Sequence, residues 1–185
     1  MSQLTQKAIV SSIKKLLNEK PLNRITIKDI TDDCGVNRMT FYYHFRDIYD
    51  LVEWMCKEDA ERIKAQHKED GNWEELLISF FNELRDNKIF FLNIYRCISR
   101  EEIEKFLHMV IDEMVMDVIN TYPESRYIRE EDKKFIARIY SYSFAGIMLD
   151  WIKNNMEDDP KALVTNLSLV ISDSIQKAIV RFKRI

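Results

Sequence analysis

The sequence predicts an all-α protein, in which an N-terminal three-helix domain with a helix-turn-helix precedes a C-terminal helical bundle, with about nine helices in total. The 185 residues include only three glycines and three prolines, which leaves few turns with which to build a sheet. Apolar residues recur at helical spacing along nearly every segment. With 46% apolar and 32% charged residues, the chain has enough material for a core and for a solvated surface.

The first helix is expected to begin after Thr5, whose hydroxyl can cap a helix N-terminus. Its apolar positions follow the i, i+4, i+7, i+8 spacing of one helix face: Ile9, Ile13, Leu16 and Leu17. The segment from Asn18 to Asn23 contains Pro21 and ends this helix. A supporting helix of this kind is the usual first element of a helix-turn-helix domain.

Two short helices joined by a tight glycine turn are expected next. Thr26 can cap the first, Asp29 can complete a capping box in place of the commoner Glu or Gln, and Gly35 can end it with a positive φ. One face of this helix carries Ile27, Ile30 and Cys34. Asn37 can cap the second helix, from Arg38 to about His44. Such a pair makes a helix-turn-helix unit, whose second helix lies in the major groove of DNA.

The stretch VNRMTFYYHF, residues 36–45, holds more aromatic rings than one short helix can bury. Phe41 and Phe45, four residues apart, are expected to face the first two helices. The other side chains of this helix are left pointing outward or to the sides: Arg38, Met39, Thr40, Tyr42, Tyr43 and His44. Exposed rings interleaved with hydrogen-bonding groups indicate a binding partner, such as a DNA backbone. The alternative for Tyr42 and His44 is packing against the first and fourth helices, and the two roles can coexist.

The remainder of the chain is expected to be helical throughout. Asp47 can cap a long helix, Ser99 and Glu102 form a capping box, and breaks fall at Gly71-Asn72 and Pro123. The expected helices are Asp47 to about Lys68, Trp73 to Arg85, Asn87 to Ile98, Ser99 to about Tyr122, about Glu130 to Asn155, and Pro160 to Arg184.

The last two helices carry apolar faces that are wider than one stripe. Either each is a central helix packed on several sides within the monomer, or it covers its own core on one side and a partner subunit on the other. Gly146, next to Ala145, would let another helix approach closely. A four-helix bundle made from two copies of this pair would bury these faces. The residues expected at such a dimer interface are Ile139, Ser143, Gly146, Ile147, Leu163, Leu167, Val170, Ile171 and Ser174.

Motifs for catalysis or metal binding do not appear. The three cysteines form no Cys-x-x-Cys pair, so neither a disulfide framework nor a zinc site is expected. None of the three histidines completes the Glu-x-x-His motif of helical di-iron sites. Neither a glycine-rich phosphate loop nor Gly-x-Ser-x-Gly occurs. We therefore expect no enzyme activity, no catalytic residue, no metal and no cofactor.

Targeting signals and charge place further limits on partners. The N-terminus MSQLTQKAIV lacks the apolar stretch of a signal peptide, and no apolar run approaches the ~20 residues of a membrane helix. We therefore expect a cytoplasmic protein with no membrane partner. The net charge of −3 argues against indiscriminate nucleic-acid binding by the whole chain. The first fifty residues differ slightly, with eight basic against six acidic side chains.

The segment ITIKDITDDCGVNRMTFYYHFRDIYDLV, residues 25–52, resembles the DNA-binding segment of the tetracycline-repressor (TetR) family of bacterial transcription regulators. The matching features are Thr26 at the start of the second helix, the Ile27/Ile30 pair, Cys34-Gly35-Val36, Thr40 to Phe45, and Leu51. The segment YSYSFAGIMLDWIKNNMEDDPKAL is similar to a C-terminal pattern of regulators from Gram-positive bacteria. NWEELLISFFNELRDNKIFFLNIY resembles the subgroup that includes activators of dihydroxyacetone-kinase operons.

This resemblance implies a homodimer whose two recognition helices read successive major grooves of a palindromic double-stranded DNA operator, ~34 Å apart. It implies phosphate contacts from Thr26, Thr40, Tyr42 and His44, and groove-facing positions for Asn37, Arg38, Met39 and Tyr43. The family often has a lysine where this chain has Ile48, so that contact is either missing or supplied by Arg24, Lys28 or Arg46. Repression is the commoner mode of action in the family.

The resemblance also implies a division into residues 1–47, which bind DNA, and residues 48–185, which form the effector-binding and dimerisation domain. A ligand bound among the C-terminal helices would change the separation of the recognition helices. The candidate pocket residues are Phe80, Phe81, Phe90, Phe91, Tyr95, His108, Tyr140, Phe144 and Trp151. No cluster of charges in the sequence indicates a ligand class. A small molecule, a protein coregulator or no effector at all remain open, as does a helical adaptor that has lost DNA binding.

Overall fold

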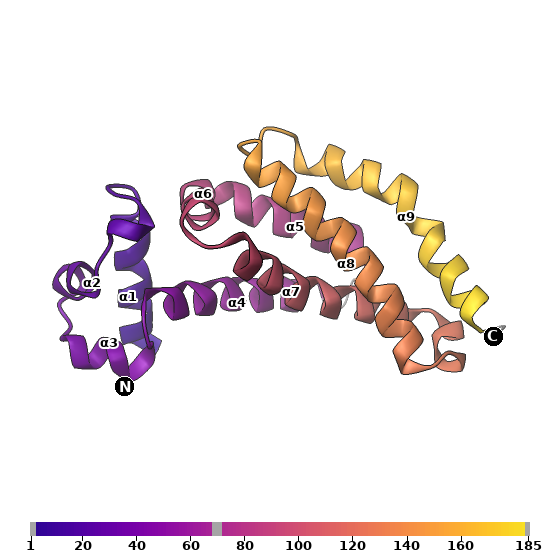
Figure 1. Cartoon of the computed structure of the whole chain (residues 1–185), viewed down its shortest axis with the longest axis horizontal. Helices are drawn as coiled ribbons and strands as arrows, with labels where there is room; N and C mark the ends of the chain where they lie inside the picture. The colour runs from indigo at the N-terminus through magenta and orange to yellow at the C-terminus, as the bar shows by residue number, and fades with distance from the viewer. Residues whose placement is uncertain (1–2, 68–71, 184–185) are drawn as a thin grey trace.

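The computed structural model describes residues 3–67 and 72–183 of the chain, and over these residues it is entirely helical apart from turns and loops. The described residues form nine α-helices and two short 3₁₀ helices, which confirms the all-α prediction (Figure 1). They are α1 (Gln3–Leu16), η1 (Leu22–Arg24), α2 (Ile27–Cys34), α3 (Arg38–His44), α4 (Ile48–Gln66), α5 (Trp73–Asp86), α6 (Lys88–Cys97), α7 (Arg100–Thr121), η2 (Pro123–Tyr127), α8 (Glu130–Lys153) and α9 (Pro160–Phe182).

The capping residues expected in the helix-turn-helix hold its helix ends in place. The Asp29 N–H donates to Thr26 Oγ at 3.1 Å and the Thr26 N–H donates to the Asp29 carboxylate at 2.7 Å, a complete capping box. Gly35 ends α2 with φ of +71°, the left-handed region that glycine adopts most easily. Asn37 Oδ1 accepts the Thr40 N–H at 2.7 Å and so begins α3.

One expected helix start is wrong. α1 already begins at Gln3, so Thr5 lies within its first turn and does not cap it. Threonine inside a helix costs only a few tenths of a kcal/mol relative to better helix formers, so its presence does not force the helix to start there. The expected break at Gly71 and the expected helix ends at Lys68 and Arg184 lie outside the described residues.

Helices α1, α2 and α3 share one hydrophobic core with parts of α4 and α6. Ile9, Ile13, Ile30, Phe41 and Leu51 are completely buried in it. The side chains that α6 contributes to this core are Phe90 and Ile94. The Ser12 hydroxyl donates to the Ile30 carbonyl at 3.1 Å and ties α1 to α2 inside the core. The helix-turn-helix is therefore supported by two helices that belong to the following segment of the chain.

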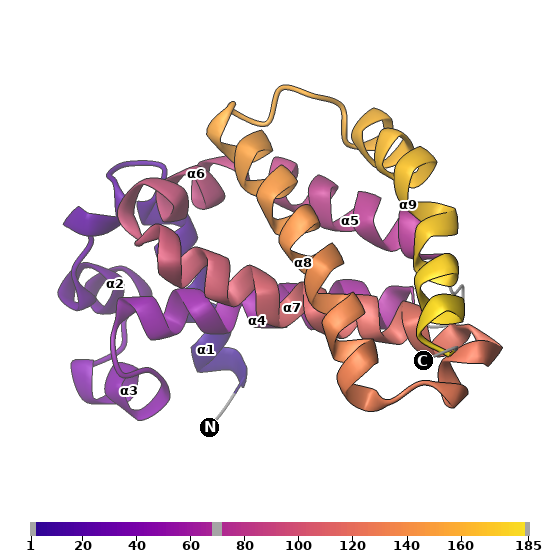
Figure 2. The ribbon, with the colours of Figure 1, turned by 45° about the vertical axis from the view of Figure 1, so that its right-hand side comes forward.

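The C-terminal bundle has its own larger core, formed mainly by α5, α7, α8 and α9. Helices α7 and α8 pack along each other, and α9 covers α5 (Figures 1 and 2). The Phe81 and Trp151 rings meet edge to face at 5.0 Å between centroids, and the Trp151 indole N–H donates to the Asp158 carbonyl at 2.9 Å. Helix α4 runs from the N-terminal domain along this bundle and is the long element common to both parts (Figure 1).

Helix α9 needs a correction to the expectation that no segment could cross a membrane. By length and composition alone, Pro160–Phe182 is apolar enough to do so. Core helices of proteins without membrane spans pass the same test, and α9 packs one side into the bundle core through Val164, Ile171, Ile175 and Ile179. Its other side is exposed, with Leu169 82% and Val170 76% accessible.

Candidate functional site

Helix α3 is held on the protein by two aromatic side chains. Phe41 and Phe45 are 0% and 2% exposed, and their rings lie 5.8 Å apart in the N-terminal core, as expected from their spacing. The Phe45 ring also meets the edge of the Trp54 ring of α4 at 5.6 Å. Because Phe41 within the seven-residue helix and Phe45 at its C-cap fix one side of α3, the opposite side must face solvent.

The outward side of α3 carries large side chains that the protein itself does not cover. Met39 is 77% exposed and Tyr43 81% exposed, and Tyr42 and Arg38 are exposed as well. His44 and Thr40 are half-buried, and the Thr40 hydroxyl lies 3.0 Å from the oxygen of the capping Asn37. Tyr42 was alternatively expected to pack against the protein. Its ring meets the Phe41 ring edge to face, with 5.9 Å between the centroids, and stays exposed otherwise. This surface presents rings, a guanidinium and hydroxyls to any partner that approaches.

Thr26 lies at the exposed N-terminus of α2, but its hydroxyl already has a partner. It donates to the Asp29 carboxylate at 2.7 Å, and the Lys20 ammonium lies 2.8 Å from the same oxygen. The Lys20 contact, together with the hydrogen bonds from Thr26, holds the pKa of Asp29 far below its usual range. A phosphate that approached Thr26 would therefore compete with a charged carboxylate for its hydroxyl.

Ile48 does not take part in the exposed surface, because it packs half-buried against the N-terminal core. Of the three basic side chains that could replace the lysine, Arg46 is already engaged, since its guanidinium donates to Asp50 at 3.0 Å. Arg24 and Lys28 are exposed and form no ion pair with any residue that the structure describes. Of the three candidate replacements for the lysine, Arg24 and Lys28 are therefore the two that are free to bind a phosphate.

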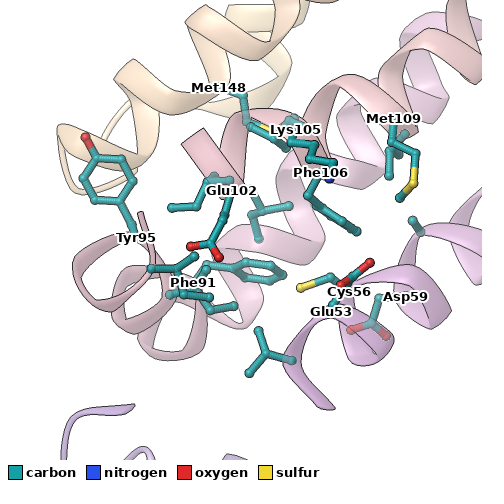
Figure 3. Close-up of a pocket in the computed structure, with 18 of the residues that line it drawn as sticks. Glu53, Cys56, Asp59, Phe91, Tyr95, Glu102, Lys105, Phe106, Met109 and Met148 are labelled. Carbon is teal, nitrogen blue, oxygen red and sulfur yellow. The ribbon is translucent and has the colours of Figure 1, made fainter. Parts of the chain in front are cut away.

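A cavity of about 630 Å³ lies between α4 on one side and α5, α6, α7 and α8 on the other (Figure 3). Three of the nine expected pocket residues line it, namely Phe80, Phe91 and Tyr95. Phe106, Met109 and Met148 line it as well, although the sequence did not single them out as pocket residues. Most of its wall is apolar, and α4 contributes the stripe Val52, Glu53, Cys56, Asp59, Ala60 and Ile63.

The other six expected pocket residues lie elsewhere. Phe81, Phe144 and Trp151 are packed in the bundle core, and Phe90 is packed in the N-terminal core. His108 Nδ1 lies 3.0 Å from the buried Ser141 hydroxyl, and the Tyr140 hydroxyl lies 2.8 Å from Ser174 Oγ. The presence of aromatic residues in the sequence therefore did not distinguish side chains of the core from side chains of the cavity wall. The spacing of 53, 56, 60 and 63 along one face of α4 is the signal that could have located the cavity.

The cavity wall also gathers charges that are scattered along the sequence. Its carboxylates are Asp47, Asp50, Glu53, Asp59, Glu83 and Glu102, and its cations are Arg46 and Lys105. The Cys56 thiol lies among them, and burial, with a smaller contribution from the nearby Asp59 carboxylate, raises its pKa to about 12. The thiol is therefore neutral and unreactive near neutral pH.

The surface expected to form a dimer interface is only partly available. Ile139, Ser143, Gly146 and Val170 are exposed, and Ile147, Leu163 and Ser174 are half-buried. Leu167 and Ile171 instead turn into the core of their own protomer. The exposed side of α8 and α9 includes three further large side chains that the sequence analysis did not assign to it: Phe135, Tyr142 and Leu169.

A helix-turn-helix with an outward-facing second helix, followed by a helical bundle with a cavity, defines a DNA-binding transcription regulator. Comparison with known families agrees with this class. The family model described as "Bacterial regulatory proteins, tetR family" matches residues 9–55, and the one described as "Transcriptional regulator C-terminal region" matches residues 71–173. The chain belongs to the TetR family of bacterial transcription regulators, which confirms the resemblance found in residues 25–52.

Individual relatives are distant but extend over nearly the whole chain. The HTH-type dhaKLM operon transcriptional activator DhaS of Lactococcus lactis subsp. lactis (strain IL1403) is 24% identical over 171 residues, covering 91% of this chain and 90% of that protein. A solved structure of the dihydroxyacetone kinase operon activator DhaS superposes with a TM-score of 0.74 at 21% identity, covering 95% of this chain and 98% of that one.

More distant solved structures share the same fold. NalD, the secondary repressor of the MexAB-OprM multidrug efflux pump in Pseudomonas aeruginosa, superposes with a TM-score of 0.62 at 16% identity, covering 96% of this chain and 98% of that one. At such identities the likeness concerns the fold alone. The named relatives include an activator and a repressor, and both are transcription regulators rather than enzymes.

Proposed function

We propose that this protein regulates transcription by binding a palindromic operator as a homodimer, with one α3 in each of two successive major grooves. The observation that carries the proposal is the outward side of α3, where Arg38, Met39 and Tyr43 are exposed while Phe41 and Phe45 anchor the helix. Two copies of α3 must then lie one helical turn of DNA apart, ~34 Å.

Within each half-site, some side chains of α3 contact bases, and other side chains of α3 and of the start of α2 contact phosphates. Arg38 reaches base edges from the first turn of α3, where a bidentate pair with guanine contributes ~1–3 kcal/mol of discrimination. Asn37, Met39 and Tyr43 lie beside it on the groove side. Tyr42, His44 and Thr40, with Lys28 and Arg24, bind phosphates and fix the register without reading sequence. Thr26 joins them by releasing its hydroxyl from Asp29 to a phosphate.

The homodimer is supported by the exposed apolar side of α8 and α9. Side chains such as Ile139, Leu169 and Val170 remain largely accessible in the single chain. Two copies related by a two-fold axis would cover these side chains with each other, in a four-helix arrangement. Gly146 lies on this side, and a Cβ added there would meet no described atom within 4 Å beyond its neighbouring residues and the backbone of its own helix.

Control by an effector is supported by the position of the cavity. Its wall includes Phe91 of α6, and the neighbouring Phe90 and Ile94 are packed in the core of the DNA-binding domain. Asn93 Oδ1 of α6 also accepts the Leu22 N–H at 3.3 Å. An occupant that prefers one placement of α4 and α6 shifts DNA affinity by its difference in affinity for the two placements. We expect this regulation to take place in the cytoplasm, with repression as its direction, since repression is the commoner mode of action in the family.

A mobility-shift assay on DNA upstream of the protein's own gene, at two salt concentrations, tests the DNA-binding proposal. We expect a shifted complex whose affinity falls steeply as salt rises, because phosphate contacts release counterions. The half-buried Ile48 in place of a lysine favours one rival, a helical adaptor that binds protein and not DNA. No complex at either salt concentration, with genome-wide mapping also finding no bound DNA, would favour that adaptor.

A further inference from the structure

The cavity lies where α4 passes from one hydrophobic core to another. The first half of α4 is packed in the N-terminal core through Leu51, Val52 and Met55. Its second half packs through Ala60 and Ile63 against Phe80, Val110 and Met114 of α5 and α7. The cavity extends along both contacts, since Val52, Ala60 and Ile63 line it too, and its volume of about 630 Å³ falls within the range of small-molecule sites.

The side chains that face this volume favour a largely apolar occupant. Phe91 and Phe106 extend into it from α6 and α7, and Met148 reaches it from α8 (Figure 3). Aromatic faces carry negative charge density and attract cations within ~6 Å of the ring centroid. Methionine side chains adapt to irregular shapes. The apolar wall therefore accepts a bulky ligand and does not by itself disfavour a positive one.

The charges on the wall decide which sign of ligand fits. Six carboxylates and two cations line the cavity, an excess of four negative charges, and three of the carboxylates, Asp47, Glu53 and Glu102, are also exposed to solvent. Lys57, which pairs with Glu53 at 2.7 Å, and Arg62, which pairs with Asp59 and Glu83 at 3.1 and 2.6 Å, reduce that excess to two. A cavity with low-dielectric walls and an excess of one sign concentrates ligands of the other sign.

We propose that the cavity binds an organic cation with bulky apolar groups, held by the rings of Phe91 and Phe106 and by the carboxylates of Glu53 and Glu102. Glu53 comes from α4 and Glu102 from the start of α7, so the cation would join the two walls of the cavity (Figure 3). The proposal rests on the proposed function, since it names the class of effector for the same site. Its rival is an apolar anion held by Lys105, which forms no ion pair with any described residue.

Tetraphenylphosphonium and tetraphenylborate make a direct test, because they have nearly the same size and shape and opposite charge. In isothermal titration calorimetry with the full chain, we expect the phosphonium ion to bind at least tenfold more tightly than the borate ion. The difference in affinity between the two ions should become smaller as added salt screens the charges on the cavity wall. Equal or tighter binding of the borate ion, or no heat from 1 mM phosphonium, would overturn the proposal.

Charge-removing variants identify the carboxylates responsible. Glu102→Gln keeps the capping box at Ser99, because glutamine serves there as well. Glu53→Gln loses only an exposed pair with Lys57, which contributes little to stability. We expect the double variant to bind phosphonium at least fivefold more weakly, with borate binding unchanged or tighter. Glu58→Gln, on the exposed side of α4, is the matched control, and a double variant that binds phosphonium like this control would contradict the assignment of Glu53 and Glu102.

The same protein in the mobility-shift assay separates this proposal from the proposed function. Phosphonium binding that leaves DNA affinity unchanged would support the cation site and contradict effector control through it. A protein that shifts DNA but gives no heat with phosphonium would keep the proposed regulator and overturn the cation site. A double variant whose thermal unfolding matches wild type rules out misfolding as the cause of weaker binding.

Discussion

Phe41 and Phe45 are the two residues that determine which side of α3 is presented to a partner. Both are buried, so the rings of Tyr42 and Tyr43 are turned away from the core by the geometry of a single helix. The two sets of side chains can therefore be changed independently. Substitutions on the outward side should alter DNA binding, and substitutions of the two phenylalanines should alter stability.

We expect Arg38→Ala combined with Tyr42→Ala to abolish operator binding while the dimer stays folded. Arg38→Ala alone should cost ~1–3 kcal/mol and relax the preference at one base pair. A mobility-shift titration measures the binding, and circular dichroism with sedimentation checks the fold and the dimer. Lys161→Ala removes an exposed positive charge from α9 as a control. Wild-type affinity in the double variant would show that α3 is not the recognition helix.

Asp29 is one of three aspartates whose pKa is lowered in the folded protein, with Asp33 and Asp50, and its protonation should reduce stability in acid. Its folded pKa is depressed by Lys20 and by the two hydrogen bonds from Thr26, so its contribution is fully present above the unfolded pKa of ~3.9. That contribution is lost as the pH falls below ~4 toward the lower folded pKa. We expect Asp29→Asn to lower the urea midpoint at pH 7 and to differ less from wild type at pH 3.5. A difference in urea midpoint between the variant and wild type that became larger at pH 3.5 would contradict this.

The cavity residues show the limit of prediction from individual residues. Nine aromatic and polar positions were expected to surround an effector, and Phe80, Phe91 and Tyr95 do line the cavity. Of the others, five pack in or against the two cores and His108 pairs with Ser141. The sequence could not separate these positions from the cavity wall, because a ring at helical spacing looks the same whether it faces a core or a void. Glu53, Glu83 and Glu102 lie far apart in the sequence, so their common position on the wall required the fold.

At the scale of the elements, α4 and α6 connect the two halves of the molecule. Each contributes to the N-terminal core and to the cavity wall. The division at residues 47 and 48 therefore describes the sequence motif better than the packing, and it stays a prediction as a boundary between domains. Any occupant of the cavity would touch helices that also support α3, and in the proposed effector control this contact is the physical route from ligand to DNA.

The turn between α2 and α3 depends on the backbone of Gly35. At φ of +71° an added Cβ would meet no neighbouring atom within 4 Å, so the only cost of a side chain is the left-handed conformation itself. We expect Gly35→Ala to destabilise the protein by about 1–2 kcal/mol. Urea unfolding measures the loss, and Gly35→Asn should lose less because asparagine tolerates this conformation better. Equal stability of the alanine variant and wild type would mean that the turn can adopt another conformation.

At the scale of the whole molecule, the proposed dimer requires that the exposed side of α8 and α9 meets a second copy, so that the two recognition helices act together. The single chain leaves Ile139, Leu169 and Val170 largely uncovered. A two-fold axis through this side would fix the separation and the orientation of the two copies of α3. In the proposed dimer, dimerisation and operator binding are therefore linked, and a weaker dimer should bind the operator more weakly.

We expect Gly146→Leu to weaken dimerisation, because the larger side chain would hold the partner helix away. The protomer itself should tolerate it, since no described atom beyond the neighbouring residues and the backbone of the same helix lies within 4 Å of an added Cβ. Analytical ultracentrifugation should show a dissociation constant at least tenfold higher, which corresponds to about 1.4 kcal/mol. Gly146→Ala, a much smaller change, is the control. An unchanged sedimentation profile for the leucine variant would place the interface elsewhere.

The sequence by itself determined the helical class, the caps at Thr26 and Asn37, the turn at Gly35 and the family, because these depend on local spacing and local hydrogen bonds. Only the tertiary structure decided where the cavity lies and which charges meet on its wall, and it showed that Leu167 and Ile171 turn inward. Those features depend on how helices distant in the sequence pack, and the periodicity of one helix carries no information about its neighbours.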